Sequence, residues 1–271
     1  MRFVHALAAL ALLAVPAAAQ DRIPSHCIAL AQSVPGAAYI HKAAWGDPLP
    51  RDWVRLNYVG HATFAIETPG GLLAATDFTG QLGNPDIVPD VVTMNHAHAT
   101  HWTPTPDPRI PHVLRGWGEG FGEPADHHLD LGEMLVRNVP TDIRSFGGVE
   151  ENGNSVFVFE VAGLCIGHLG HLHHEPTPAQ YALIGRLDVV MAPVDGGMTL
   201  DLPTMIRVLK RFRSRVVIPM HWFGDGTLQA FVGGMEDEFD VVWTGENSID
   251  LSLETLPSRP TVMVLRPRPL R

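Results

Sequence analysis

The sequence has few basic residues and no cluster of them. Its 271 residues contain 19 Lys and Arg against 29 Asp and Glu, which gives a formal net charge of −10 at pH 7. A surface with this excess of negative charge repels nucleic-acid phosphates, which binding proteins neutralise with Lys and Arg. Nucleic acid is therefore not expected as a partner.

No run of apolar residues is long enough to span a membrane. The longest, residues 6–15, is shorter than the roughly 20 apolar residues that a transmembrane helix needs. It follows Arg2 and precedes three alanines at 17–19, which is the arrangement of a secretory signal. We therefore predict a signal peptide over residues 1–19 and a mature chain from Gln20. The protein is then periplasmic or secreted, and it is not held in a membrane after the signal is cleaved.

Cysteine is scarce, with only Cys27 and Cys165 in the chain. An exported protein meets an oxidising environment, so these two residues can form a disulfide that ties the N-terminal segment to a core strand. Alternatively, Cys165 in "GLCIGHL" is a small buried apolar residue, as free cysteine often is. The sequence leaves both readings open.

The chain also lacks a Ser/Gly linker, a low-complexity segment and an internal repeat. We therefore predict one domain over residues 53–271. Residues 20–52 show no clear periodicity and contain four prolines, so we expect them to form an extension that packs on this domain.

The domain reads as short apolar or alternating segments separated by turn residues, the pattern of a strand-rich protein. Helical periodicity is confined to residues 178–185 and 201–213. The predicted strands are 54–59, 62–68, 72–77, 90–95, 134–139, 155–161, 164–169, 188–193, 216–221 and 261–265. Strands and helices in this order favour an α/β or α+β sandwich in which helices cover layers of strands.

Histidines follow three of these strands. The stretch "VVTMNHAHATHW" places His96, His98 and His101 after one strand, a second group includes His171, and His221 ends a third strand. Ligand sites often form where the C-terminal ends of strands meet, and residues two apart in an extended segment point the same way. Imidazoles without cysteine favour zinc, with manganese or iron as alternatives. The competing interpretation is a set of solvated loop histidines.

Five segments in order resemble the metallo-β-lactamase superfamily. They are "YVGHATFAIETPGG", "NHAHATH", "GHLGHLHHEPTPAQ", "DVVMAPVDGGMTLD" and "VVIPMHW". They are most similar to its UlaG-like branch of metal-dependent hydrolases, and the similarity runs from about residue 55 to 221. The resemblance implies an α+β fold, a four-layer αβ/βα sandwich, with a metal site at one edge of its two sheets.

The resemblance also assigns metal ligands. The family's His-x-His-x-Asp-His motif falls on His96, His98, Thr100 and His101, and its last metal histidine falls on His221. The aspartate that commonly bridges two metals in the family is replaced here by a histidine.

That histidine is His171, and a further family histidine is replaced by Ile143. A threonine at position 100 supplies no anionic oxygen, and an imidazole cannot bridge two ions. The predicted site therefore holds one tightly bound ion, with ligands drawn from His96, His98, His101, His171 and His221.

Two aspartates are candidate catalytic residues. Asp77 matches the family's strand-end aspartate and is predicted to orient a ligand histidine; the alternative is a turn cap. Asp195, in "PVDGG", stands where the family usually has glycine and is a candidate proton acceptor; the alternative is again a turn residue.

Zinc held by imidazoles acidifies a water and polarises carbonyl or phosphoryl oxygens. The leading hypothesis is thus an exported hydrolase that acts on a small-molecule ester, lactone, amide or phosphoester. A periplasmic metal-binding or sensing protein without turnover is one alternative. An all-histidine redox metalloprotein is the other.

Overall fold

The computed structural model describes residues 24–29 and 45–271, so the expected signal peptide at 1–19 and the mature N-terminus lie outside the described residues. No described helix is long and apolar enough to cross a bilayer. The helices are α1 (His26–Ala29), α2 (Pro178–Ile184), α3 (Leu202–Phe212) and α4 (Asp225–Met235), with a 3-10 turn at Leu253–Thr255. The strands are β1 (Val54–Gly60), β2 (Thr63–Glu67), β3 (Leu73–Ala75), β4 (Val91–Met94), β5 (His112–Arg115), β6 (His128–Asp130), β7 (Met134–Ser145), β8 (Gly148–Val161), β9 (Leu164–His168), β10 (Val189–Pro193), β11 (Val216–Met220), β12 (Asp240–Trp243), β13 (Ser248–Leu251) and β14 (Thr261–Val264).

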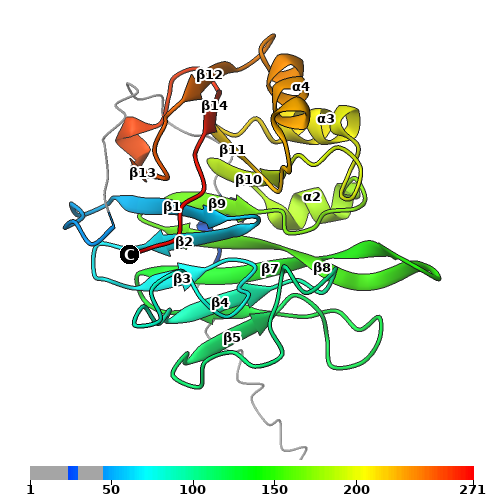
Figure 1. The fold of residues 1–271 in the computed structure, drawn as a ribbon, viewed down its shortest axis with the longest axis horizontal. Coiled ribbons are helices and arrows are strands. Elements are labelled where there is room, and N and C mark those ends of the chain that lie inside the picture. The colour runs from blue at the N-terminus through cyan, green and yellow to red at the C-terminus, as the bar shows by residue number, and fades with distance from the viewer. Residues whose placement is uncertain (1–23, 30–44) are drawn as a thin grey trace, which may run out of the picture.

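The strands form two sheets that pack face to face (Figure 1). One has six strands in the order β13-β1-β2-β3-β4-β5, and the other has eight in the order β12-β14-β11-β10-β9-β8-β7-β6. Alternation along each strand sends every second side chain between the sheets. Leu56 of β1 and Phe157 of β8 belong to this central core, whereas Val156 and Val158 face the other side of the larger sheet. The central core therefore joins the two sheets.

Three helices cover the outer face of the eight-stranded sheet, where β9, β10 and β11 run parallel (Figure 1). Strands β10 and β11 are buried along their whole length, as expected when a parallel sheet is covered on both faces. Thr177 caps α2 and Asp201 caps α3, each by accepting a backbone N–H of the first turn. The helices predicted at 178–185 and 201–213 are both present.

The outer face of the six-stranded sheet is covered by loops and not by helices of the described residues. Phe78, Leu82 and Ile110 pack against this face, together with Leu270 near the C-terminus. A bridge between Gly83 and Leu270 holds the C-terminal segment there. The α+β sandwich is confirmed, while a helical layer on this side, expected from the αβ/βα pattern, is replaced by loops in the part of the chain that is described.

The N-terminal segment is fastened to the larger sheet by a disulfide between Cys27 and Cys165, whose Cα atoms lie 5.8 Å apart. Ser25 donates a hydrogen bond to Glu160 of β8, and the backbone N–H of Arg186 donates to the carbonyl of Cys27 (2.9 Å). Of the two sequence-based readings of the cysteines, the structure adopts the bridge.

Candidate metal centre

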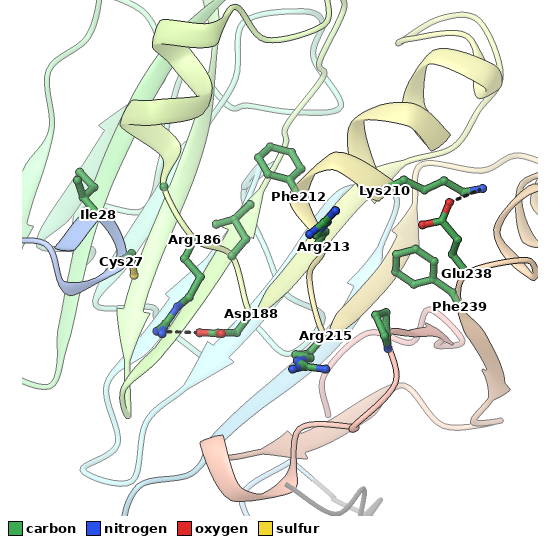
Figure 2. A pocket seen from close by; sticks show the side chains of 13 residues that line it. Cys27, Ile28, Arg186, Asp188, Lys210, Phe212, Arg213, Arg215, Glu238 and Phe239 are labelled. Atoms are coloured by element: carbon green, nitrogen blue, oxygen red, sulfur yellow. Dashed lines mark ion pairs between the residues drawn. The ribbon is translucent and has the colours of Figure 1, made fainter. Parts of the chain in front are cut away.

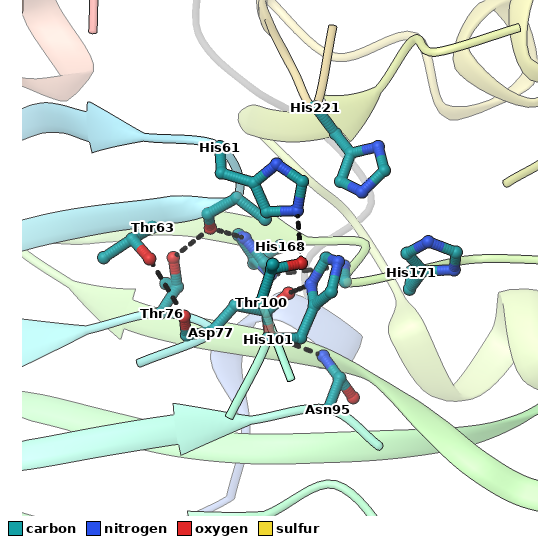
Figure 3. Close-up of polar contacts among 12 residues, drawn as sticks. His61, Thr63, Thr76, Asp77, Asn95, Thr100, His101, His168, His171 and His221 are labelled. Carbon is teal, nitrogen blue, oxygen red and sulfur yellow. Dashed lines mark hydrogen bonds and ion pairs between the residues drawn. The ribbon is translucent and has the colours of Figure 1, made fainter. Parts of the chain in front are cut away.

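Side chains that follow strands of both sheets come together at one site, as the labelled Asp77, His101, His171 and His221 show (Figure 3). In the smaller sheet, β3 leads to Asp77 and β4 leads to the loop 95–101. In the larger sheet, β9, β10 and β11 lead to His171, Asp195 and His221. Because β9, β10 and β11 are parallel neighbours, their C-terminal ends lie along the same edge.

Four histidines converge at this edge, and their ligand nitrogens all lie within 4.8 Å of one another: His98, His101, His171 and His221. The Nε2 atoms of His98 and His171 are 3.1 Å apart. The Nε2 atoms of His101 and His221 are buried and have no hydrogen-bond partner among the described residues. Two nitrogens that each bind one tetrahedral zinc at about 2.1 Å must lie roughly 3.4 Å apart, so the donor set fits such an ion.

Each of these imidazoles has a polar partner at Nδ1, which leaves Nε2 to face the centre. The partners are Asp77 for His101 (2.5 Å), Asp195 for His221 (2.9 Å), Thr100 for His98 (2.7 Å) and His173 for His171. Two carboxylates, one hydroxyl and one imidazole therefore fix the orientation of the four rings.

Asp77 lies directly behind His101 and has no exposed side-chain surface. Its second oxygen accepts a hydrogen bond from Nδ2 of Asn95 (2.8 Å), and Oδ1 of Asn95 accepts the backbone N–H of Ser155 (2.7 Å). Burial raises the pKa of Asp77 to about 6. Asp77 is therefore placed to orient the His101 ring, and its role at a metal centre stays a prediction.

The position of Asp195 does not fit the predicted proton acceptor. Its Oδ1 accepts the backbone N–H groups of Gly197, Met198 and Thr199, at 2.6 to 3.0 Å, and its Oδ2 accepts the Thr199 hydroxyl (2.6 Å) and contacts His221. Although burial opposes ionisation, these hydrogen bonds hold the pKa of Asp195 well below its usual range. Asp195 is therefore a fully bonded buried carboxylate that holds His221 and closes its own loop.

His96 lies outside the group, which corrects the prediction that it binds the ion. Its Nδ1 is 3.0 Å from Oε1 of Glu150, and its ring stacks on Trp117 at 4.9 Å. Strand β4 ends at Met94, and the next residues form bends and a turn that the His101 N–H closes on the carbonyl of His98 (3.0 Å). The alternation of an extended strand no longer applies there, so His96 and His98 point in different directions.

The environment of His98, His101 and His171 favours the neutral imidazole, the form that binds metals. Burial, reinforced by the neighbouring imidazoles, lowers the pKa of His101 to about 2. The same causes place the pKa of His171 far below its ordinary value, and burial lowers that of His98. The ligand rings for which a shift is resolved therefore offer lone pairs at neutral pH.

Further polar residues surround the four histidines. The His61 ring lies 4.2 Å from that of His221, and its Nε2 is 2.8 Å from the Thr100 hydroxyl. Asn154 accepts the backbone N–H of His171 (2.8 Å). A histidine at a strand-to-strand turn was a visible signal for His61, whereas the hydroxyl and amide partners become apparent only when the chain is folded.

A cavity of about 720 Å³ lies beside the disulfide, away from the four-histidine group (Figure 2). Its cations include Arg186, Lys210 and Arg213, which stand next to the C-terminal ends of α2 and α3. Basic side chains at such positions stabilise the negative ends of helix dipoles. Arg186 and Lys210 also form ion pairs, so this cavity has a structural explanation.

Comparison with known proteins places this arrangement in a family. A metal-dependent hydrolase of the UPF0173 group from Salinibacter ruber is 26% identical over 215 residues, covering 68% of this chain and 92% of the relative. Its counterpart from Carboxydothermus hydrogenoformans is 24% identical over 213 residues with the same coverage. A crystal structure from Thermotoga maritima, described as that of a candidate zinc-dependent hydrolase of the metallo-β-lactamase superfamily, is 27% identical, covers 78% of this chain and 98% of its own, and has a TM-score of 0.55.

The sequence profile of the β-lactamase superfamily domain matches residues 55–221, which is more than half of the chain. The matched region contains the whole four-histidine group and the two aspartates behind it. The chain therefore belongs to the metallo-β-lactamase superfamily.

Proposed function

We propose that this protein is an exported hydrolase that holds one zinc ion between His98, His101, His171 and His221. The observation that carries the proposal is the convergence of four nitrogens within 4.8 Å, two of them buried without a partner in the described chain. The relatives from Salinibacter ruber and Carboxydothermus hydrogenoformans, both described as metal-dependent hydrolases, support hydrolysis as the reaction.

The residues of the chain prepare the centre in advance. Asp77 and Asp195 fix the rings of His101 and His221, and burial removes competing water from behind them. A zinc ion bound there supplies Lewis-acid chemistry, since it lowers the pKa of a water and polarises a carbonyl or phosphoryl oxygen. Both cysteines are joined in the disulfide, so neither serves as a nucleophile. An ester, lactone, amide or phosphoester is the expected substrate.

A single ion is favoured by the side chains around the four histidines. The Thr100 hydroxyl contacts Nδ1 of His98 and Nε2 of His61, so both of its contacts are with imidazoles. Nδ1 of His171 contacts His173, so this ring offers one nitrogen to the centre. Ile143 is apolar and buried. These three positions supply no carboxylate oxygen for a second ion.

Export is supported by two independent features. The first residues have the composition of a secretory signal. The disulfide between Cys27 and Cys165 is a bond that persists in oxidising compartments.

The test is hydrolysis of 4-nitrophenyl acetate, a γ-lactone and bis(4-nitrophenyl) phosphate by zinc-loaded and chelator-treated protein. We expect turnover of at least one compound that chelation abolishes and zinc restores. The matched pair His98→Ala and His96→Ala comes from the same short segment: the first should lose bound zinc and turnover, and the second should keep both. Tight zinc binding without turnover would replace the hydrolase with a metal-binding protein, and reductant-sensitive visible absorption would indicate a redox centre.

A further inference from the structure

A second cavity, of about 530 Å³, borders the metal centre on the side of His61 and Thr100. Its other walls include the apolar side chains of Leu82 and Pro269 and the polar side chains of Thr79 and Gln81. Cavities of this size suit small-molecule ligands. Thr79 and Gln81 are exposed, and their side chains make no hydrogen bond with the described residues.

The lining of this cavity carries no Asp, Glu, Lys or Arg, although the chain has 48 such residues. Two other cavities of the described residues are lined by charged side chains. The cavity next to His96 is lined by four glutamates, Glu119, Glu123, Glu150 and Glu151. The cavity beside the disulfide contains three arginines and a lysine.

The uncharged lining continues to the metal centre. Thr100 lines the cavity, and its hydroxyl is 2.7 Å from Nδ1 of His98. The Phe223 ring is 63% exposed and lies 5.6 Å from the ring of His61 and 5.2 Å from that of His221. A molecule that lies over these residues on its way from the cavity to the four nitrogens meets aromatic, hydroxyl and apolar surfaces.

We propose that this cavity binds an uncharged part of the substrate and so selects neutral acyl or alcohol groups. The reason is desolvation, because a charged group that enters loses water and finds no counter-charge in the lining, whereas an uncharged group loses little. The amide of Gln81 and the hydroxyl of Thr79 can hydrogen-bond a neutral oxygen or nitrogen. This inference rests on the proposed function, since it places the reacting bond at the metal centre.

The test measures binding and not turnover. Three hydroxamic acids with the same zinc-binding group and tails of similar length are titrated calorimetrically into the zinc-loaded protein: pentanohydroxamic acid (neutral), glutaric monohydroxamic acid (anionic) and 4-(trimethylammonio)butanohydroxamic acid (cationic). We expect the neutral compound to bind about tenfold more tightly than either charged one. Gln81→Lys should then improve binding of the anionic compound about fivefold and leave that of the neutral compound unchanged.

The matched control is Gln229→Lys, which adds the same charge at an exposed glutamine of α4, outside the cavity. It should leave the order of the three compounds unaltered. Equal binding of all three compounds, or equal effects of the two lysine variants, would overturn the inference while leaving the metal centre in place. Failure of all three to bind the zinc-loaded protein would overturn the proposed function as well.

Discussion

Replacing Thr100 by valine should weaken zinc binding about tenfold to a hundredfold, the range measured when outer partners of metal-bound histidines are removed. When Nε2 of His98 faces the ion, its Nδ1 carries a proton and donates it to the Thr100 hydroxyl (2.7 Å), which in turn donates to Nε2 of His61 (2.8 Å). Valine keeps the shape of the side chain and deletes both hydrogen bonds. Two bonds at about 0.5–1.5 kcal/mol each amount to about 1–3 kcal/mol, which matches the same range of affinities.

The affinity is measured by competition with a chromogenic zinc chelator, with Thr100→Ser as the control that restores the hydroxyl. Thr100 is exposed, so water can replace its hydrogen bonds in the metal-free protein, and the melting temperature of the metal-free protein should change little among the three forms. Nitrogen-15 NMR of the imidazoles should show His98 in one tautomer in the wild type and the serine variant, and a mixture in the valine variant. Zinc affinity of the valine variant within threefold of wild type, or a serine variant as weak as valine, would refute the reasoning.

Four further outcomes are expected. Elemental analysis after dialysis against metal-free buffer should find one ion per chain, and two retained ions would revive a dinuclear site. Gly170→Ala should lower both stability and zinc affinity. The added Cβ would lie 2.3 Å from Nδ2 of Asn95 and 2.5 Å from Oδ1 of Asn154, and alanine would also be strained at the φ of +58° that residue 170 adopts. Unchanged melting and zinc titration curves would contradict this. The metal-free protein should lose stability as the pH falls from 6.5 towards 3. His61 and His101 have pKa values of about 3 and 2 in the folded protein, so they take up protons in this range only when the chain is unfolded. Urea unfolding at several pH values checks the sign of this change. Reducing the disulfide, which joins residues 138 apart, should cost at most about 5 kcal/mol in the chain-entropy model, and an unchanged urea midpoint after reduction would argue against the bridge.

The sequence was most informative where strands are buried and apolar. Strands such as β4, β10 and β11 were predicted within a residue or two, because a continuous run of buried apolar residues ends sharply at a loop. Strands β5, β6, β12 and β13 were missed, and all four are short edge strands. The first three are partly exposed, so their side chains carry little of the apolar signal, whereas β13 is buried but alternates apolar residues with Ser248 and Asp250.

The candidate site was predicted in its ligand types but not in its detailed geometry. The grouping of His98, His101, His171 and His221 follows from strand ends that share one edge, which topology dictates. The direction of His96 depends on a bend directly after β4, and local sequence does not specify that bend. From the sequence, Thr100 was interpreted only as the loss of a metal ligand. In the folded chain its hydroxyl contacts His98 and also His61, which comes from a distant turn. Sequence spacing alone does not reveal the second contact.

The two carboxylates behind His101 and His221 also determine the charge balance of the centre. Asp77 and Asp195 have no exposed side-chain surface, and each is separated from the central point by a single imidazole ring. A dication placed there would be balanced by two full negative charges. A monovalent ion would leave one carboxylate uncompensated in a low-dielectric interior, and a trivalent ion would leave one positive charge in excess. The centre should therefore discriminate by valence before it discriminates by element, and the ion that it holds adds little net field of its own to attract charged molecules from solution.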